Sequence, residues 1–158
     1  MKKKILYAVL LFESVSFFNF SCKKEHDKSL YDLNIALSNK GARQGFIKFR
    51  QDPDAAKIIT LDIWVQHLAP NREYQLQRAV DAIDVVDGNC TSASWLTLGK
   101  GLLPQSILTD KHGKGSEALW RDVTAIPSGS TFDIHFRVID AVSSAIVLTS
   151  DCYQYQIR

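Results

Sequence analysis

Three cysteines, Cys22, Cys90 and Cys152, are the residues of this chain best suited to covalent chemistry. Cys22 directly follows an apolar N-terminal stretch, which sets it apart from the other two. Cys90 and Cys152 then form an even pair, and in a small exported domain such a pair predicts a disulfide. In the chain-entropy model, closing a loop of this length stabilises a fold by about 4 kcal/mol. A reactive thiol or a metal-binding pair is disfavoured because no Cys-x-x-Cys or His-Cys spacing is present.

The histidines are the next candidates for chemistry, as metal ligands. They are His26, His67, His112 and His135, and no two of them have the spacing of a metal-binding pair. We therefore expect isolated surface histidines and no cofactor. The alternative is that His67, His112 and His135 converge at one end of the folded domain and bind a metal ion.

Three carboxylates recur at intervals of three residues, at Asp81, Asp84 and Asp87, just before Gly88 and Asn89. Oxygen-rich loops of this kind can bind calcium. The alternating ligand order of an EF-hand is missing, however, and the intervening alanine, isoleucine and valines resemble core residues. We therefore interpret the carboxylates as solvated loop residues, with a weak calcium site as the alternative.

No catalytic motif is present. The chain lacks the G-x-S-x-G, H-E-x-x-H, P-loop and dinucleotide-binding glycine patterns. It also lacks the clustered basic stripe that nucleic-acid binding requires. The sequence therefore favours a protein that is neither an enzyme nor a nucleic-acid-binding protein.

One aromatic residue stands out as a candidate for binding a partner. Trp64 lies between Asp62 and Gln66, on the more polar face of a predicted strand. Together with Tyr153 or Tyr155 from the last strand, it would form a surface patch for a protein or glycan partner.

The elements that must position these residues are strands. Apolar and polar residues alternate with a period of two along most of the chain, and no stretch predicts a helix of ten or more residues. A long connection, 81–101, has room for short strands at 83–86 and 95–98. Eight or nine short strands separated by turns predict an all-β domain, and a β-sandwich is favoured over a barrel. The predicted strands are 31–37, 45–50, 58–68, 73–80, 107–109, 118–123, 131–139, 145–149 and 152–157.

The N-terminus resembles a bacterial lipoprotein signal peptide. Lys2, Lys3 and Lys4 precede an apolar run, 5–11, that is too short to span a membrane. Residues 15–24 (V-S-F-F-N-F-S-C-K-K) end this segment with a small residue, a cysteine and two lysines, although the box before the cysteine is looser than usual. The resemblance implies that Ser21 is the last residue removed and that Cys22 becomes an acylated N-terminus.

This resemblance divides the chain into a signal peptide (1–21), a polar tether (22–29) and a β-sandwich domain (30–158). Removal of the signal takes three of the 19 basic and one of the 17 acidic residues, which leaves the mature chain without net charge. The mature protein is expected in the bacterial cell envelope, held by its lipid to a membrane outside the cytoplasm.

Four short segments of the domain resemble the copper/zinc superoxide dismutase-like and CHRD-type sandwiches. They are 45–49 (G-F-I-K-F), 59–65, 68–70 (L-A-P) and 109–113 (T-D-K-H-G). The resemblance implies an immunoglobulin-like Greek-key sandwich of about eight strands. Dismutases carry an H-x-H pair soon after the L-x-P corner, but here 74–77 reads Y-Q-L-Q. The resemblance thus implies the fold and argues against the dismutase activity.

These observations favour a membrane-anchored lipoprotein that acts as a non-enzymatic binding or interaction module. A metal-binding or enzymatic derivative of the dismutase-like fold is one alternative. A periplasmic module that inhibits an enzyme by inserting a loop is another.

Overall fold

The computed structural model describes residues 30–158, and these residues contain twelve strands and no helix. The predicted signal peptide (1–21), the acylated Cys22, the tether (22–29) and its His26 lie outside the described residues. Since they form no helix, residues 30–158 include no helical span long and apolar enough to cross a membrane. The strands are β1 (Asp32–Asn39), β2 (Ala42–Gln51), β3 (Ile58–Val65), β4 (Glu73–Val80), β5 (Leu96–Thr97), β6 (Gly99–Lys100), β7 (Leu103–Pro104), β8 (Ser106–Leu108), β9 (Gly115–Asp122), β10 (Thr131–Asp140), β11 (Ile146–Thr149) and β12 (Tyr153–Gln156).

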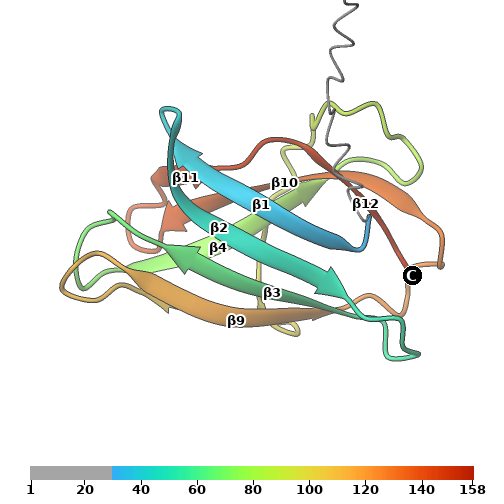
Figure 1. The fold of residues 1–158 in the computed structure, drawn as a ribbon, viewed down its shortest axis with the longest axis horizontal. Coiled ribbons are helices and arrows are strands. Elements are labelled where there is room, and N and C mark those ends of the chain that lie inside the picture. Colours follow the sequence, from blue (N-terminus) through green and yellow to red (C-terminus); the bar gives the residue numbers. More distant parts are fainter. Residues whose placement is uncertain (1–29) are drawn as a thin grey trace, which may run out of the picture.

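All twelve strands join one continuous hydrogen-bonded sheet. Its order is β5-β4-β10-β11-β1-β2-β3-β9-β6-β7, and β12 pairs with β10 while β8 pairs with β4. In Figure 1, β4 and β10 pass behind β1 and β2, so the sheet curls back on itself and encloses a core. The short strands β5 to β8 lie on β4 and β9, at the two ends of this curled sheet, which therefore nearly closes into a barrel.

The prediction of an all-β domain is confirmed. The count of about eight strands is too low, because β5, β6 and β7 are only two residues long and β8 is three. Two of these strands overlap predicted ones, β5 with 95–98 and β8 with 107–109, whereas β6 and β7 are too short to show an alternation of apolar and polar residues and the sequence does not predict them.

The predicted short strand at 83–86 does not form. The backbone of Asp84 adopts a φ of +60°, which interrupts an extended strand. Ile83 and Val85 are 54% and 55% exposed, so these apolar residues belong to a surface loop rather than to the core. This loop, 81–95, is the yellow-green segment at the upper right of Figure 1.

The core fills the inside of the curled sheet. Because side chains alternate between the two faces of a strand, every second residue of the long strands points inward. Each large apolar side chain that is fully buried in this way contributes about 1.5–3 kcal/mol. The largest buried side chains include Ile35, Leu37, Ile47, Phe49, Leu61, Ile63, Leu76, Phe136 and Leu148.

Cys90 and Cys152 form a disulfide, with their Cα atoms 5.4 Å apart, which confirms the prediction from the sequence. The bond joins the 81–95 loop to the residue that precedes β12. Because this loop contains no strand of its own, the disulfide is one of the contacts that fix its position on the sheet.

Candidate ligand-binding cavity

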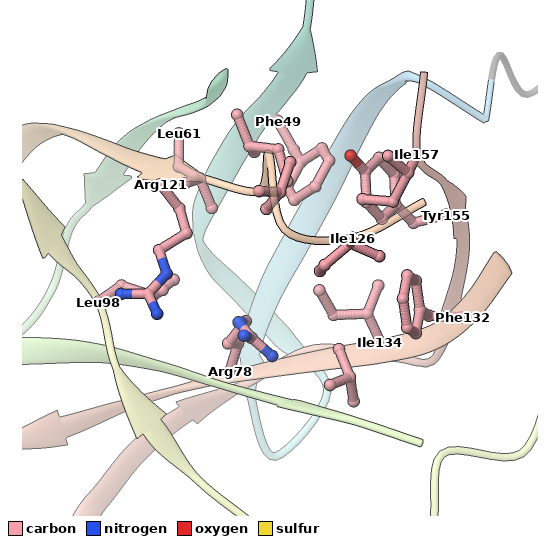
Figure 2. Close-up of a pocket in the computed structure, with 13 residues that line it drawn as sticks. Phe49, Leu61, Arg78, Leu98, Arg121, Ile126, Phe132, Ile134, Tyr155 and Ile157 are labelled. Carbon is pink, nitrogen blue, oxygen red and sulfur yellow. The ribbon is translucent and has the colours of Figure 1, made fainter. Parts of the chain in front are cut away.

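A largely apolar cavity lies inside the curled sheet, at the end where β1 begins and β12 finishes. The volume of the cavity is about 60 Å³. Figure 2 shows the aromatic and aliphatic side chains gathered on one side of this space, and two arginines on the other. The apolar side is formed by Phe49, Ile126, Phe132, Ile134, Tyr155 and Ile157.

Arg78 enters the cavity from β4. Tyr74, Leu76, Arg78 and Val80 occupy alternate positions of this strand, and Tyr74 and Leu76 are fully buried. The alternation of a strand therefore turns the Arg78 side chain to the inside, next to core residues. Its guanidinium makes no hydrogen bond and no ion pair with any residue in 30–158.

Arg121 enters the cavity from β9, at the inward-facing position between Leu119 and Val123. One of its guanidinium nitrogens donates a hydrogen bond to the carbonyl oxygen of Gly101, at 3.1 Å. The nearest acidic side chain along the same strand face, Glu117, is paired with Lys100 at 2.9 Å. Arg121 thus has a hydrogen bond to the backbone and no ion pair within the described residues, although its charge acts on the neighbouring carboxylate of Asp122.

The two arginines influence one another. Burial lowers the pKa of the Arg78 guanidinium from its ordinary value, and the positive charge of Arg121 lowers it further. An arginine side chain carries a positive charge at neutral pH. The cavity therefore has a positively charged side as well as an apolar side.

Tyr155 closes the apolar side of the cavity. Its hydroxyl donates a hydrogen bond of 2.7 Å to Oε1 of Gln51, so its polar atom is already satisfied within the core. Burial raises the pKa of Tyr155 well above its usual value. The ring packs edge-on against Phe49, with the ring centroids 4.8 Å apart.

The chemistry available to this cavity is binding rather than bond-making. Among the described residues that line it, none is a histidine, cysteine, serine, aspartate or glutamate. The lining thus offers no nucleophile and no acid–base pair of the usual kinds. It offers an apolar surface, one tyrosine whose hydroxyl already has a partner, and two cationic donors.

The structure places the predicted partner-binding residues apart from one another. Trp64 is 38% exposed on the outer face of β3, and its aromatic neighbour is Phe46, whose ring stacks on it at a centroid distance of 4.6 Å. Tyr155 is only 3% exposed and is a core residue rather than part of a surface patch. Tyr153 packs against the core, and its hydroxyl accepts a hydrogen bond from the backbone N–H of Ala36. The outer aromatic surface is therefore a Phe46–Trp64 pair without the two tyrosines.

The three carboxylates considered for calcium each accept hydrogen bonds from the backbone. Asp81 accepts from the N–H groups of Thr91 and Ser92, and these bonds lower its pKa. Asp84 accepts from the N–H of Thr131, and Asp87 from the N–H two residues after it. In the described part of the chain, no group of three or more histidine, cysteine or acidic residues is arranged to hold a metal ion. Through these hydrogen bonds, the carboxylates stabilise the conformation of the 81–95 loop.

The three described histidines do not share a site either. His67 and His112 are exposed in adjacent turns, which are joined by the hydrogen bond from Leu68 N–H to the Gly113 carbonyl. His135 lies on β10, where its ring contacts Trp95 at a centroid distance of 4.6 Å and its Nε2 lies 3.0 Å from the carbonyl oxygen of Ser92.

Sequence reasoning missed Arg78 and Arg121. Their signal was present, because each arginine falls in the inward phase of a strand whose other residues in that phase are apolar. An isolated charge in that phase is unfavourable unless something compensates it. Their meeting in space could not be read from the sequence, because β4 and β9 do not pair with each other.

Comparison with known proteins adds no relative. No protein-family model, no curated protein and no solved structure matches this chain.

Proposed function

We propose that this chain is a non-enzymatic binding module that holds a small, largely apolar ligand in the cavity inside its curled sheet. The observation that carries the proposal is the cavity itself. Protein interiors are close-packed, with few voids larger than a water molecule. The lined space of about 60 Å³, which opens to the surface, is several times the roughly 10–15 Å³ that one water molecule needs.

The absence of a catalytic motif from the sequence and the composition of the lining both favour binding over catalysis. The described lining residues include no nucleophile and no carboxylate, while apolar side chains form most of the wall. A module of this kind would carry, sense or present its ligand without changing it.

We also propose that the module is anchored through an acylated Cys22 to a membrane outside the cytoplasm. The signal-like residues 1–21 support this, as does a disulfide, which persists in oxidising compartments. Tyr31, where the described domain begins, donates a hydrogen bond to Gln156 and so lies at the same end as the cavity. The tether 22–29 spans at most about 28 Å when extended, so this end of the domain would stay close to the membrane.

The immunoglobulin-like Greek-key sandwich is part of the same proposal. One layer would contain β1, β2, β3 and β9, which pair in that order, and the other would contain β4, β10 and β12. These pairings support the assignment, and the short strands β5 to β8 would then be additions that fill one open side.

The binding function is tested with a neutral fluorescent probe, N-phenyl-1-naphthylamine, titrated into the mature chain (22–158, with Cys22→Ser to prevent acylation). All of the described strands and the disulfide are retained in this chain. We expect saturable fluorescence enhancement that is lost in Ile126→Trp, which fills the cavity, and kept in Trp64→Ala, which removes the outer aromatic surface. Near-UV circular dichroism checks that both variants are folded.

Two results contradict the proposal. One is the absence of saturable binding to the unsubstituted chain. The other is the reverse pattern, with binding lost in Trp64→Ala and kept in Ile126→Trp, because the ligand site would then be the outer face of β3.

The anchor is tested separately, by the intact mass of the protein isolated from its native membrane fraction. We expect a chain that begins at Cys22 and carries acyl groups, and whose mass rises by two hydrogens on reduction. An unmodified chain that retains residues 1–21 would contradict the envelope assignment.

A further inference from the structure

The charge on one side of the cavity requires an explanation. Moving an ionised side chain away from water costs free energy unless an opposite charge or hydrogen bonds compensate it. Arg78 is half-buried among core residues and has no such partner within residues 30–158, so the only compensation for its guanidinium nitrogens is the solvent that still reaches them. Arg121 has one backbone hydrogen bond and no ion pair within these residues.

Three of the other five arginines in the described residues have a polar partner, whereas Arg43 and Arg158 only lie over aromatic rings. Arg50 pairs with Asp32 at 3.1 Å, and Arg72 pairs with Asp140 at 3.4 Å. Arg137 donates a hydrogen bond to Gln77 at 2.7 Å. Arg78 and Arg121 differ from these three because both are turned towards an open space that also has an apolar wall.

The cavity has two chemically different sides, one cationic and one apolar. In Figure 2 the guanidinium groups of Arg78 and Arg121 point into one side of the cavity, and Phe49, Phe132 and Ile157 face it from the other. Guanidinium groups bind carboxylates and phosphates through pairs of parallel hydrogen bonds. Hydrocarbon is favoured against the opposite wall.

We infer that the cavity binds an amphiphile with a single oxyanion head, carboxylate or phosphate, held between Arg78 and Arg121, and a hydrocarbon tail packed against the aromatic and aliphatic wall. This inference rests on the proposed function, because it names the class of ligand that the cavity takes. It also explains why two like charges are kept on inward-facing positions of β4 and β9.

A purely structural role is the competing explanation. Long arginine side chains can cover apolar surface with their methylene groups while the charged end stays in water. In that case the arginines would not influence which head group binds. The test must therefore separate preference for the head group from binding of the tail.

The experiment is competition for the same fluorescent probe on the mature chain described above. The competitors are decanoate, decyl phosphate and decanol, which share one tail, together with acetate and inorganic phosphate, which have a head and no tail. We expect decanoate or decyl phosphate to displace the probe at concentrations 10- to 100-fold lower than decanol, as charge-assisted hydrogen bonds of about 1.5–3 kcal/mol predict. The tighter of the two identifies the preferred oxyanion, and the headless and tailless competitors are expected to be weak.

Variants locate the preference. Arg78→Met and Arg121→Met should each remove most of the advantage of the anion over decanol while leaving displacement by decanol within about twofold. Arg78→Lys keeps the charge but loses the planar fork, and it should retain part of the preference. Arg50→Met, which removes an arginine from a surface ion pair, is the matched control and should retain all of it.

The outcomes separate this inference from the proposed function. If decanol competes as well as the two anions, the cavity binds ligands but the arginines do not select them, and the inference is wrong while the proposed function stands. If acetate or phosphate alone competes as well as decanoate, the tail is dispensable and the amphiphile is excluded. If the probe itself does not bind, both proposals fail.

Discussion

Two neighbouring residues of β4 show how differently this domain treats its inner and outer polar groups. Gln77 points outward, where its side-chain amide donates to Thr97 and its carbonyl oxygen accepts from Arg137. Arg137 in turn lies over the ring of Trp95, 4.0 Å from its centroid. Each of these side chains thus has a partner from the chain itself.

Arg78, the next residue along the strand, points inward and has no such partner within residues 30–158. The nitrogens of Arg78 are not among the fully buried polar atoms that lack a partner, so they remain open to water or to a ligand. Gln77 therefore helps to attach the loop to the sheet through hydrogen bonds, whereas Arg78 is available to bind a ligand. Four predictions test this separation.

The largest effect is expected from the disulfide that holds the outer loop. Replacing both Cys90 and Cys152 with alanine should lower the free energy of unfolding by about 4 kcal/mol, since the closed loop is long. Urea denaturation of the oxidised wild type and of the double variant measures the difference. At low urea, the probe should still bind the folded variant, because neither cysteine lines the cavity. Loss of the cavity together with the loop would show that the two regions are not separate.

The next effect is expected from Trp95, which lies between His135 and Arg137 on the outer side of β10. Trp95→Ala removes apolar contact and a cation–π interaction, and it should lower the free energy of unfolding by about 2 kcal/mol. Hydrogen exchange should increase mainly in the 81–95 loop. A loss of stability without faster exchange in the loop would contradict the role of Trp95 as its attachment to the sheet.

The long strands could be predicted because alternation is a local property of the sequence, and the disulfide because only two cysteines remain to pair. Alternation along Ile58–Val65 and Thr131–Asp140 reports one buried face directly, and two remaining cysteines can pair in only one way. The aspartates that hold the 81–95 loop in place were harder to predict. The sequence predicts Asp81 as a solvated loop residue, with a weak calcium site as the alternative, whereas in the structure its oxygens accept hydrogen bonds from the backbone of Thr91 and Ser92.

The cavity could not be predicted because it depends on how distant strands are placed. Arg78 and Arg121 come from strands at opposite ends of the sheet order, and only the curling of the sheet brings them together. The same reason explains why the sequence alone leaves Tyr155 open between the core and a surface patch with Trp64. Its strand is short, and the hydrogen bond that draws its hydroxyl inward comes from Gln51, far away in the sequence.

Tyr155 should give a smaller effect that depends on pH. Below pH 10 the tyrosine is neutral in both states, and Tyr155→Phe should cost about 1 kcal/mol through the lost hydrogen bond to Gln51. Above pH 10 the unfolded tyrosine ionises, whereas burial raises the pKa in the folded state, so folding becomes less favourable as the pH rises. Urea denaturation at pH 8 and pH 11 should show a shallower loss of stability in Tyr155→Phe than in the wild type. Equal losses would mean that Tyr155 is accessible to hydroxide in the folded state.

The last prediction is a small gain in stability on replacing Arg78, and it tests the comparison of Gln77 with Arg78 most directly. Arg78→Met replaces an uncompensated inward charge by an apolar side chain of similar length, so it should raise the free energy of unfolding of the ligand-free protein by about 1 kcal/mol. Arg50→Met should change it by less than about 0.5 kcal/mol, as is usual for an exposed ion pair. Urea denaturation of the two variants side by side measures both values. A clear loss of stability in Arg78→Met would mean that the guanidinium supports the fold as Gln77 does. A gain would show that the chain keeps Arg78 at a cost to its own stability, as expected of a residue retained for a ligand.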